Sequence, residues 1–162
     1  MIDEEKNDLA FTGVTQLLEK YPLDVRLWKI LGVCHFKCGN KLNAVSAFKK
    51  VLTFEPEDEE ITCNLSIVYL KLGETKKAQK ILEEFDENYK TTSKVNILLS
   101  EISLQKGDLF SARKILYNAL RKKPPTVEVY LLLGVIFTKL EKTSRAVQIY
   151  KTALKKFPKN FH

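Results

Sequence analysis

Apolar residues recur along this chain at a fixed period of 34 residues, separated by stretches of polar and charged residues. The period is clearest at two positions of the repeating unit, one held by Ala44, Ala78, Ala112 and Ala146 and the other by Leu31, Leu65, Leu99 and Leu133. Repetition at this length is typical of a helix-turn-helix unit that buries its apolar face only against neighbouring units. The pattern therefore predicts an all-α chain of stacked antiparallel helix pairs.

Glycine and proline mark the places where each unit has to turn or end. Two registers stand out, the first held by Gly39, Gly73 and Gly107, the second by Pro56, Pro124 and Pro158, with Lys90 at the proline position of the second unit. Glycine suits the turn between two helices, whereas proline ends a helix because its ring clashes with the preceding turn and removes a donor. These marks place four repeats at residues 25–58, 59–92, 93–126 and 127–160.

The residues before the first repeat fit the same period when it is counted backward. Ala10 then holds the alanine position and Pro22 the terminal proline, and an apolar stripe is formed by Leu9, Val14, Leu17 and Leu18. We expect a helix over about residues 3–22, the second helix of a repeat whose first helix is absent. No polar capping helix follows the last repeat, and solenoids normally need polar caps. One interpretation is that the chain is part of a longer protein; the other is that its open ends associate with a second copy or another protein.

The repeated residues resemble the tetratricopeptide repeat family. The first repeat shows Trp28, Leu31, Gly32, Gly39, Ala44, Phe48 and Pro56, and the fourth shows Tyr130, Leu133, Gly134, Phe137, Ala146, Tyr150, Ala153 and Pro158. The departures are local, with Ser66 and Ser100 in place of the small glycine of the first helix and Glu141 in place of a turn glycine. The resemblance implies one domain over residues 1–162, folded as a right-handed superhelical solenoid of antiparallel helix pairs.

Charge is spread unevenly along the 162 residues, whose net charge is +7. Residues 1–92 hold 13 basic and 16 acidic residues, and residues 93–162 hold 14 basic and 4 acidic residues. A basic half could attract an acidic protein, nucleic acid or an anionic membrane surface. Lysine outnumbers arginine 23 to 4, and few aromatic residues interleave with the basic ones, so nucleic-acid binding is not favoured. No apolar run approaches the roughly 18 residues that a membrane span needs.

Few residues are suited to catalysis or to metal binding. The two histidines are His35 and His162, and the sequence contains neither a glycine-rich phosphate loop nor a serine nucleophile motif. Cys34, Cys38 and Cys63 fit no disulfide framework or metal-ligand spacing, so we expect all three to be reduced and structural. The chain is therefore predicted to be a non-catalytic protein without metal or cofactor, in an intracellular, reducing compartment.

The resemblance places the binding site in a groove lined by the first helices of successive repeats. Its expected residues are Lys29, Val33, Phe36, Lys37, Cys63, Asn64, Ile67, Leu70, Lys71, Lys94, Ile97, Glu101, Leu131, Val135 and Lys139. Three of them, Lys29, Asn64 and Lys94, also match positions of the carboxylate clamp found in some domains of this family, although Val33 and Leu98 hold the other two clamp positions. The floor of this groove is mainly apolar and lysines recur along one margin.

Such a groove suits a peptide or helix of another protein that has apolar anchors and acidic flanks. We therefore expect a protein-protein interaction scaffold. Two alternatives stay open at this point. The size and repeat number resemble the small helical chaperones of type III secretion, which cradle an apolar segment of a client protein. The basic half would instead suit an adaptor for nucleic acid or for an anionic membrane surface.

Overall fold

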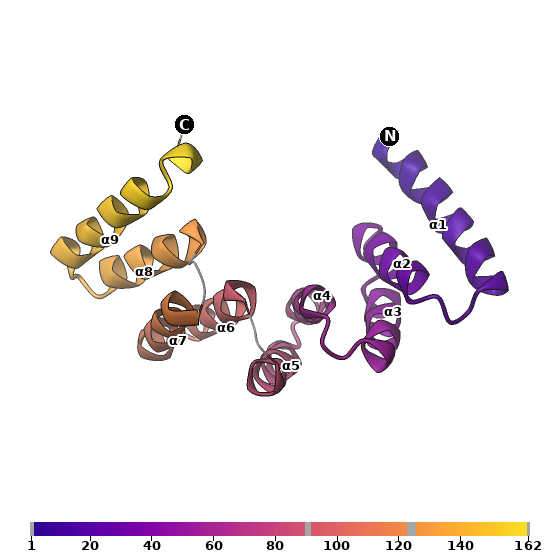
Figure 1. Cartoon of the computed structure of the whole chain (residues 1–162), viewed down its shortest axis with the longest axis horizontal. Coiled ribbons are helices and arrows are strands. Elements are labelled where there is room, and N and C mark those ends of the chain that lie inside the picture. The colour runs from indigo at the N-terminus through magenta and orange to yellow at the C-terminus, as the bar shows by residue number, and fades with distance from the viewer. Residues whose placement is uncertain (1, 90–91, 123–125, 162) are drawn as a thin grey trace. The chain divides into compact units, whose positions relative to one another are not determined.

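The computed structural model describes residues 2–89, 92–122 and 126–161, and the side chains of residues 11–89, 92–121 and 126–160. These residues form α-helices, one short 3-10 helix and no strand (Figure 1). The chain divides into two compact units, residues 1–89 and 90–162. The first unit contains α1 (Ile2–Lys20), α2 (Val25–Lys37), α3 (Lys41–Phe54), α4 (Glu59–Lys71) and α5 (Thr75–Asn88). The second contains α6 (Ser93–Gln105), α7 (Leu109–Lys122), α8 (Val127–Lys139), α9 (Thr143–Lys156) and a 3-10 helix, η1 (Pro158–Phe161).

Side-chain caps fix the start of the first helix in three of the pairs. Asp24 accepts a hydrogen bond from the backbone amide of Arg26 at the start of α2, and Asp58 accepts one from Ile61 at the start of α4, each at 3.0 Å. Thr92 does the same for α6. A cap of this kind satisfies one of the amides that a helix leaves unpaired in its first turn.

The turn inside every pair closes with the same two backbone hydrogen bonds. In the first pair, the amide of Gly39 donates to Phe36 at 3.2 Å and the amide of Asn40 donates to His35 at 2.8 Å. Equivalent bonds close the other three turns, an arrangement known as the Schellman motif. The motif needs a left-handed residue, and the three turn glycines have φ of 78° to 80°. In the fourth turn this residue is Glu141, with φ of 58°, so a glutamate takes the place of glycine.

Small residues permit the two helices of each pair to approach closely. A Cβ built on Gly32 would come within 2.5 Å of the Phe48 ring, and one built on Gly134 would clash with the ring of Tyr150. The same position of the period is held by Ser66 in α4, which is fully buried. Its hydroxyl donates to the carbonyl of Cys63 at 2.8 Å, so its polar atom is satisfied within the helix.

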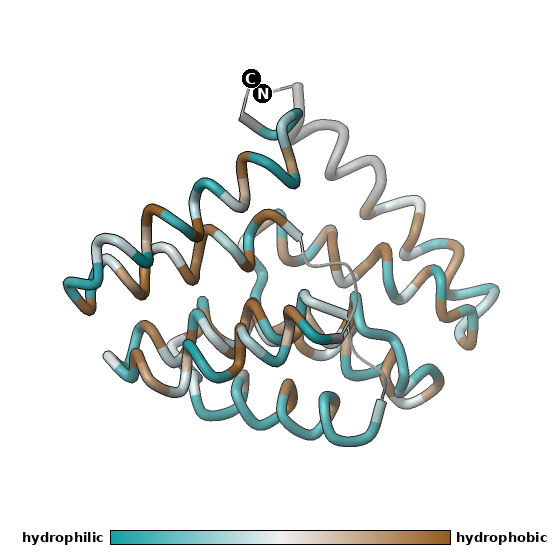
Figure 2. Tube along the Cα trace, turned by 60° about the vertical axis from the view of Figure 1, so that its left-hand side comes forward, coloured by the Kyte–Doolittle hydropathy of each residue, from teal (hydrophilic) through white to brown (hydrophobic). Residues whose placement is uncertain are grey.

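Each unit has its own core along the helix interfaces. In the first unit α3 contacts both α2 and α4, and in the second α7 contacts both α6 and α8. The periodic alanines lie in these interfaces, and each is no more than 3% exposed. Figure 2 shows hydrophobic and hydrophilic residues alternating along the helices, as amphipathic helices require.

The first helix packs on α2 by a narrower stripe than the sequence suggests. It spans Ile2–Lys20, and Val14 and Leu18 pack together with Leu31 in one buried cluster. Leu17 was expected in this stripe and lies three residues from Val14, but its side chain is 45% exposed. The side chains of Leu9 and Ala10 lie outside the described residues.

The cysteines and the internal histidine pack differently from one another. Cys34 and Cys63 are buried, whereas Cys38 is exposed at the end of α2 and therefore does not fill the core as expected. His35 is buried with its ring 5.1 Å from that of Phe11, and burial lowers the pKa of its imidazole. Within the described part of the chain, no group of three His, Cys, Asp or Glu side chains could hold a metal ion. None of the described helices is long and apolar enough to cross a membrane.

Candidate partner-binding cleft

A cleft of about 390 Å³ opens between α2 and α4 in the first unit. We call it the α2–α4 cleft, and its lining residues are Lys29, Ile30, Val33, Cys34, Lys37, Asp58, Glu60, Ile61 and Asn64. The α2 residues follow a spacing of three and four, which places their side chains along one face of the helix. The cleft is therefore a product of two helices that occupy equivalent positions in consecutive repeats.

The walls of the cleft are apolar and partly open to solvent. Ile61 forms a buried part of the wall at 3% exposure, whereas Ile30 is 46% exposed and Val33 is half-buried. Asn64 adds a half-buried side-chain amide, which can both donate and accept a hydrogen bond. An apolar wall with a single amide suits the side chain and the adjoining backbone of a bound segment.

The ammonium group of Lys29 is held by two carboxylates of the chain itself. Its Nζ lies 2.6 Å from Oε2 of Glu55 and 2.6 Å from Oδ2 of Asp58. Asp58 and Glu55 together raise the pKa of Lys29 above its ordinary value. Burial acts to raise the pKa of Asp58, but hydrogen bonds from Lys29 and from the amide of Ile61 outweigh it and leave that pKa below its ordinary value. A partner carboxylate at Lys29 would therefore compete with these two side chains.

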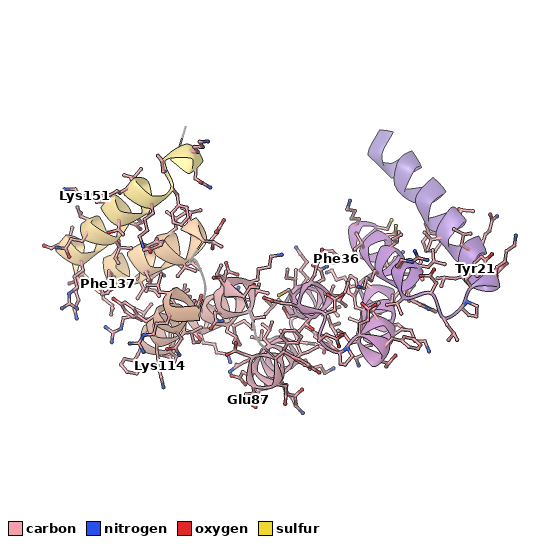
Figure 3. The ribbon with its side chains drawn as sticks, in the orientation of Figure 1. Tyr21, Phe36, Glu87, Lys114, Phe137 and Lys151 are labelled. Atoms are coloured by element: carbon pink, nitrogen blue, oxygen red, sulfur yellow. The ribbon has the colours of Figure 1, made fainter. Side chains whose placement is uncertain are left out.

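The structure brings together four of the predicted groove residues of the first unit, namely Lys29, Val33, Lys37 and Asn64. The other predicted residues of this unit do not line the cleft. Phe36, Ile67 and Leu70 are half-buried, Cys63 is 6% exposed, and Lys71 lies with its Nζ 6.0 Å from the centre of the Phe36 ring. Figure 3 labels Phe36 on α2. Because Cys63 is buried, it can offer a partner very little surface.

The lining of the cleft also includes residues that are absent from the set expected from the sequence, among them Ile30 and Asp58. Ile30 lies three residues before Val33 and seven before Lys37, so helical spacing could have placed it on the groove face. Asp58 carried no such signal, because it precedes α4 and enters the cleft through its role as the cap of that helix. Its contribution depends on the loop geometry between α3 and α4.

The predicted groove residues of the second unit lie on α6 and α8, which are in contact. Ile97 packs against the core of this unit, and Leu131 and Val135 are 37% and 38% exposed on α8. Glu101 is half-buried, and burial raises the pKa of its carboxyl. Lys94 and Lys139 are exposed. Leu131 and Val135 are four residues apart, so they form a short apolar strip on one face of α8.

The lysines of α9 differ in their surroundings, since some are exposed to solvent and one contacts α8. Lys151 and Lys155 are exposed on α9, and Figure 3 shows Lys151 on the outside of that helix. Lys156 donates to the hydroxyl of Tyr130 at 2.9 Å, and its Nζ lies 5.4 Å from the centre of the same ring. The ammonium of Lys156 thus ties α9 to α8.

Similarity to known proteins extends over most of these helices. Models described as tetratricopeptide repeat match residues 25–58, 64–92 and 128–160. The tetratricopeptide repeat-containing protein trd-1 of Caenorhabditis elegans is 26% identical over 84 residues, which are 52% of this chain and 11% of that protein. The chain thus spans only 11% of the length of this relative.

Solved structures are similar in fold over nearly the whole chain. The crystal structure of MamA has a TM-score of 0.79 and 19% identity, covering 98% of this chain and 92% of that one. YrrB, described as a TPR protein with an unusual peptide-binding site, has a TM-score of 0.68 and 17% identity, covering 97% of this chain and 81% of that one. Together with the repeated helix pairs and their shared turns, the matches show that the chain belongs to the tetratricopeptide repeat family, an all-α solenoid of antiparallel helix pairs.

Proposed function

We propose that this chain is a non-catalytic protein-interaction scaffold that captures a segment of a partner protein in the α2–α4 cleft. The observation that carries the proposal is an apolar wall that stays open to solvent, with Ile30 46% exposed beside the half-buried Val33. Burying one large apolar side chain of a partner at such a wall contributes about 1.5–3 kcal/mol. That is enough for one anchor of a longer contact.

The polar groups of the cleft support the same proposal. The amide of Asn64 can pair with the backbone of an extended segment, and Lys37 and Glu60 lie exposed among the residues that line the cleft. YrrB, which shares the fold, is a protein with a peptide-binding site. Its example supports the general mode of binding.

A second candidate function rests on the charge of the second unit. Lys151 and Lys155 are exposed on α9, and residues 93–162 carry 14 basic against 4 acidic residues. This surface suits an acidic protein or another anionic surface. Binding of that kind weakens steeply between low and moderate salt, whereas binding at the apolar cleft persists.

Variants of the cleft test the first candidate in the native cell. We expect Ile30→Asn to remove most of the partner captured by the tagged chain at moderate salt, because it replaces open apolar surface with an amide. The matched control is Leu42→Asn, since Leu42 is 73% exposed on α3, outside the cleft. Quantitative mass spectrometry measures the captured protein, and circular dichroism checks that both variants keep their helicity. Equal capture by wild type and Ile30→Asn would overturn the proposal.

A further inference from the structure

We infer that the segment bound in the α2–α4 cleft carries an apolar anchor between a basic residue on one side and an acidic residue on the other. The inference rests on the proposed function and specifies the chemistry of the partner. The basic and acidic flanks inferred here differ from the two acidic flanks that the lysines in the sequence predict. The reason is that the two ends of this cleft have opposite charge.

The direction of the two helices follows from two contacts. Lys29, in the first half of α2, pairs with Asp58, the cap at the start of α4. Phe36, near the end of α2, lies beneath the ammonium of Lys71, the last residue of α4. Since the beginnings meet and the ends meet, α2 and α4 run parallel. The cleft therefore has one end formed by helix starts and another formed by helix ends.

Carboxylates dominate at the helix starts. Glu55, Asp58 and Glu60 bring three negative charges, and Lys29 supplies one positive charge in contact with two of them. Each helix start adds roughly half a positive charge from its backbone dipole, which leaves this end negative. Glu60 is exposed and forms no ion pair with the described residues, so its carboxylate is available to a partner cation.

Lysines dominate at the helix ends. Lys37 lines the cleft and Lys71 lies beside Phe36, and both are exposed. Lys41 adds a third ammonium, which donates to the carbonyl of Lys71 at 3.1 Å. The backbone dipoles contribute roughly half a negative charge at each helix end, so this end stays positive. Lys37 makes no ion pair among the residues that the structure describes.

The spacing of the two ends sets the spacing of the charges in the partner. Lys29 and Lys37 are eight residues apart on one helix, which corresponds to about 12 Å along its axis. An extended segment covers that distance in about four residues. In an extended partner segment the opposite charges therefore lie about four positions apart, with an apolar side chain between them. Either chain direction satisfies this requirement.

A display library of random dodecapeptides, selected on the full chain at low salt, tests the inference. Selected peptides are made synthetically, and their dissociation constants are measured by fluorescence anisotropy for wild type and for Ile30→Asn. We expect cleft-dependent peptides to carry a basic and an acidic residue about four positions apart around an apolar one. Replacing either charge in the peptide should weaken binding by roughly 2- to 5-fold, as exposed ion pairs do.

Charge reversal in the protein is the second part of this test. Glu60→Lys makes both ends of the cleft basic, so the chain should now prefer peptides with two acidic flanks. Lys49→Glu, an exposed reversal on α3 outside the cleft, should leave the preference unchanged. Peptides that need Ile30 yet carry uniform flanks, or show no charge preference, overturn the inference and leave the proposed function standing. Failure to obtain any peptide that depends on Ile30 overturns the proposed function and the inference with it.

Discussion

Single residues decide how closely the helices of a pair can pack. Gly32 and Gly134 stand where a side-chain carbon would enter the ring of Phe48 or Tyr150. Phe48 is fully buried, so its ring cannot move aside without opening the core. The glycine at this position is therefore needed for space, whereas the turn glycines are needed for their backbone conformation.

Alanine substitutions at two glycines should have opposite effects on stability. Gly32→Ala should lower the free energy of unfolding by about 1–3 kcal/mol, because the added methyl group overpacks the contact with Phe48. Gly13→Ala should raise it by roughly 0.5–1 kcal/mol, since Gly13 is inside α1 and a Cβ there meets no atom within 4 Å. Urea unfolding followed by circular dichroism measures both. A Gly32→Ala chain as stable as wild type would refute the close approach.

A second residue-scale prediction concerns the turn between α8 and α9. Glu141 has φ of 58°, a conformation that costs a non-glycine residue roughly 1–2 kcal/mol. We expect Glu141→Gly to stabilise the chain by about 1 kcal/mol, because glycine adopts this conformation freely. The matched control is Glu128→Gly in the first turn of α8, which should destabilise the chain. Thermal unfolding of the two variants measures whether each substitution raises or lowers the stability of the chain. Destabilisation by both substitutions would contradict the backbone strain assigned to Glu141.

At the scale of the elements, the 34-residue period predicts the helices well. In each repeat the close contact between the paired helices, the turn that joins them and the end of the second helix fall at fixed positions of the period. The turn glycines and the buried alanines are local signals of this kind. The cleft is harder to predict, since it depends on which side chains of α2 and α4 face one another. Periodicity gives the face of one helix, but it does not indicate that Cys63 is buried while Ile30 stays 46% exposed.

The loop between α3 and α4 supplies residues of the cleft that the periodic pattern of the helices does not predict. The acidic end of the cleft depends on Glu55 after α3 and Asp58 before α4, both held by Lys29. In the sequence these residues form part of an acidic stretch with no indication that they meet a lysine 26 or 29 residues earlier. The ion pairs also show that a lysine in a groove is not always available to a partner.

For the whole molecule, repetition accounts for the family and the fold, and departures from repetition account for the candidate site. The charge difference between residues 1–92 and 93–162 is one such departure, and the acidic end of the α2–α4 cleft is another. A solenoid offers many similar helix faces, so the partner has to be selected by the residues that differ between repeats. We expect this selection to take place in the α2–α4 cleft.

Photo-crosslinking in the native cell tests whether the partner contacts this cleft. A photoreactive benzoylphenylalanine is placed at Glu60 in the cleft, at Leu42 on α3 or at Lys151 on α9, and the adducts formed on irradiation are identified by mass spectrometry. We expect an adduct with one partner protein from position 60, its loss when Ile30→Asn is added, and no adduct with that partner from position 42 or 151. An adduct from position 42 or 151 together with none from position 60 would contradict this expectation.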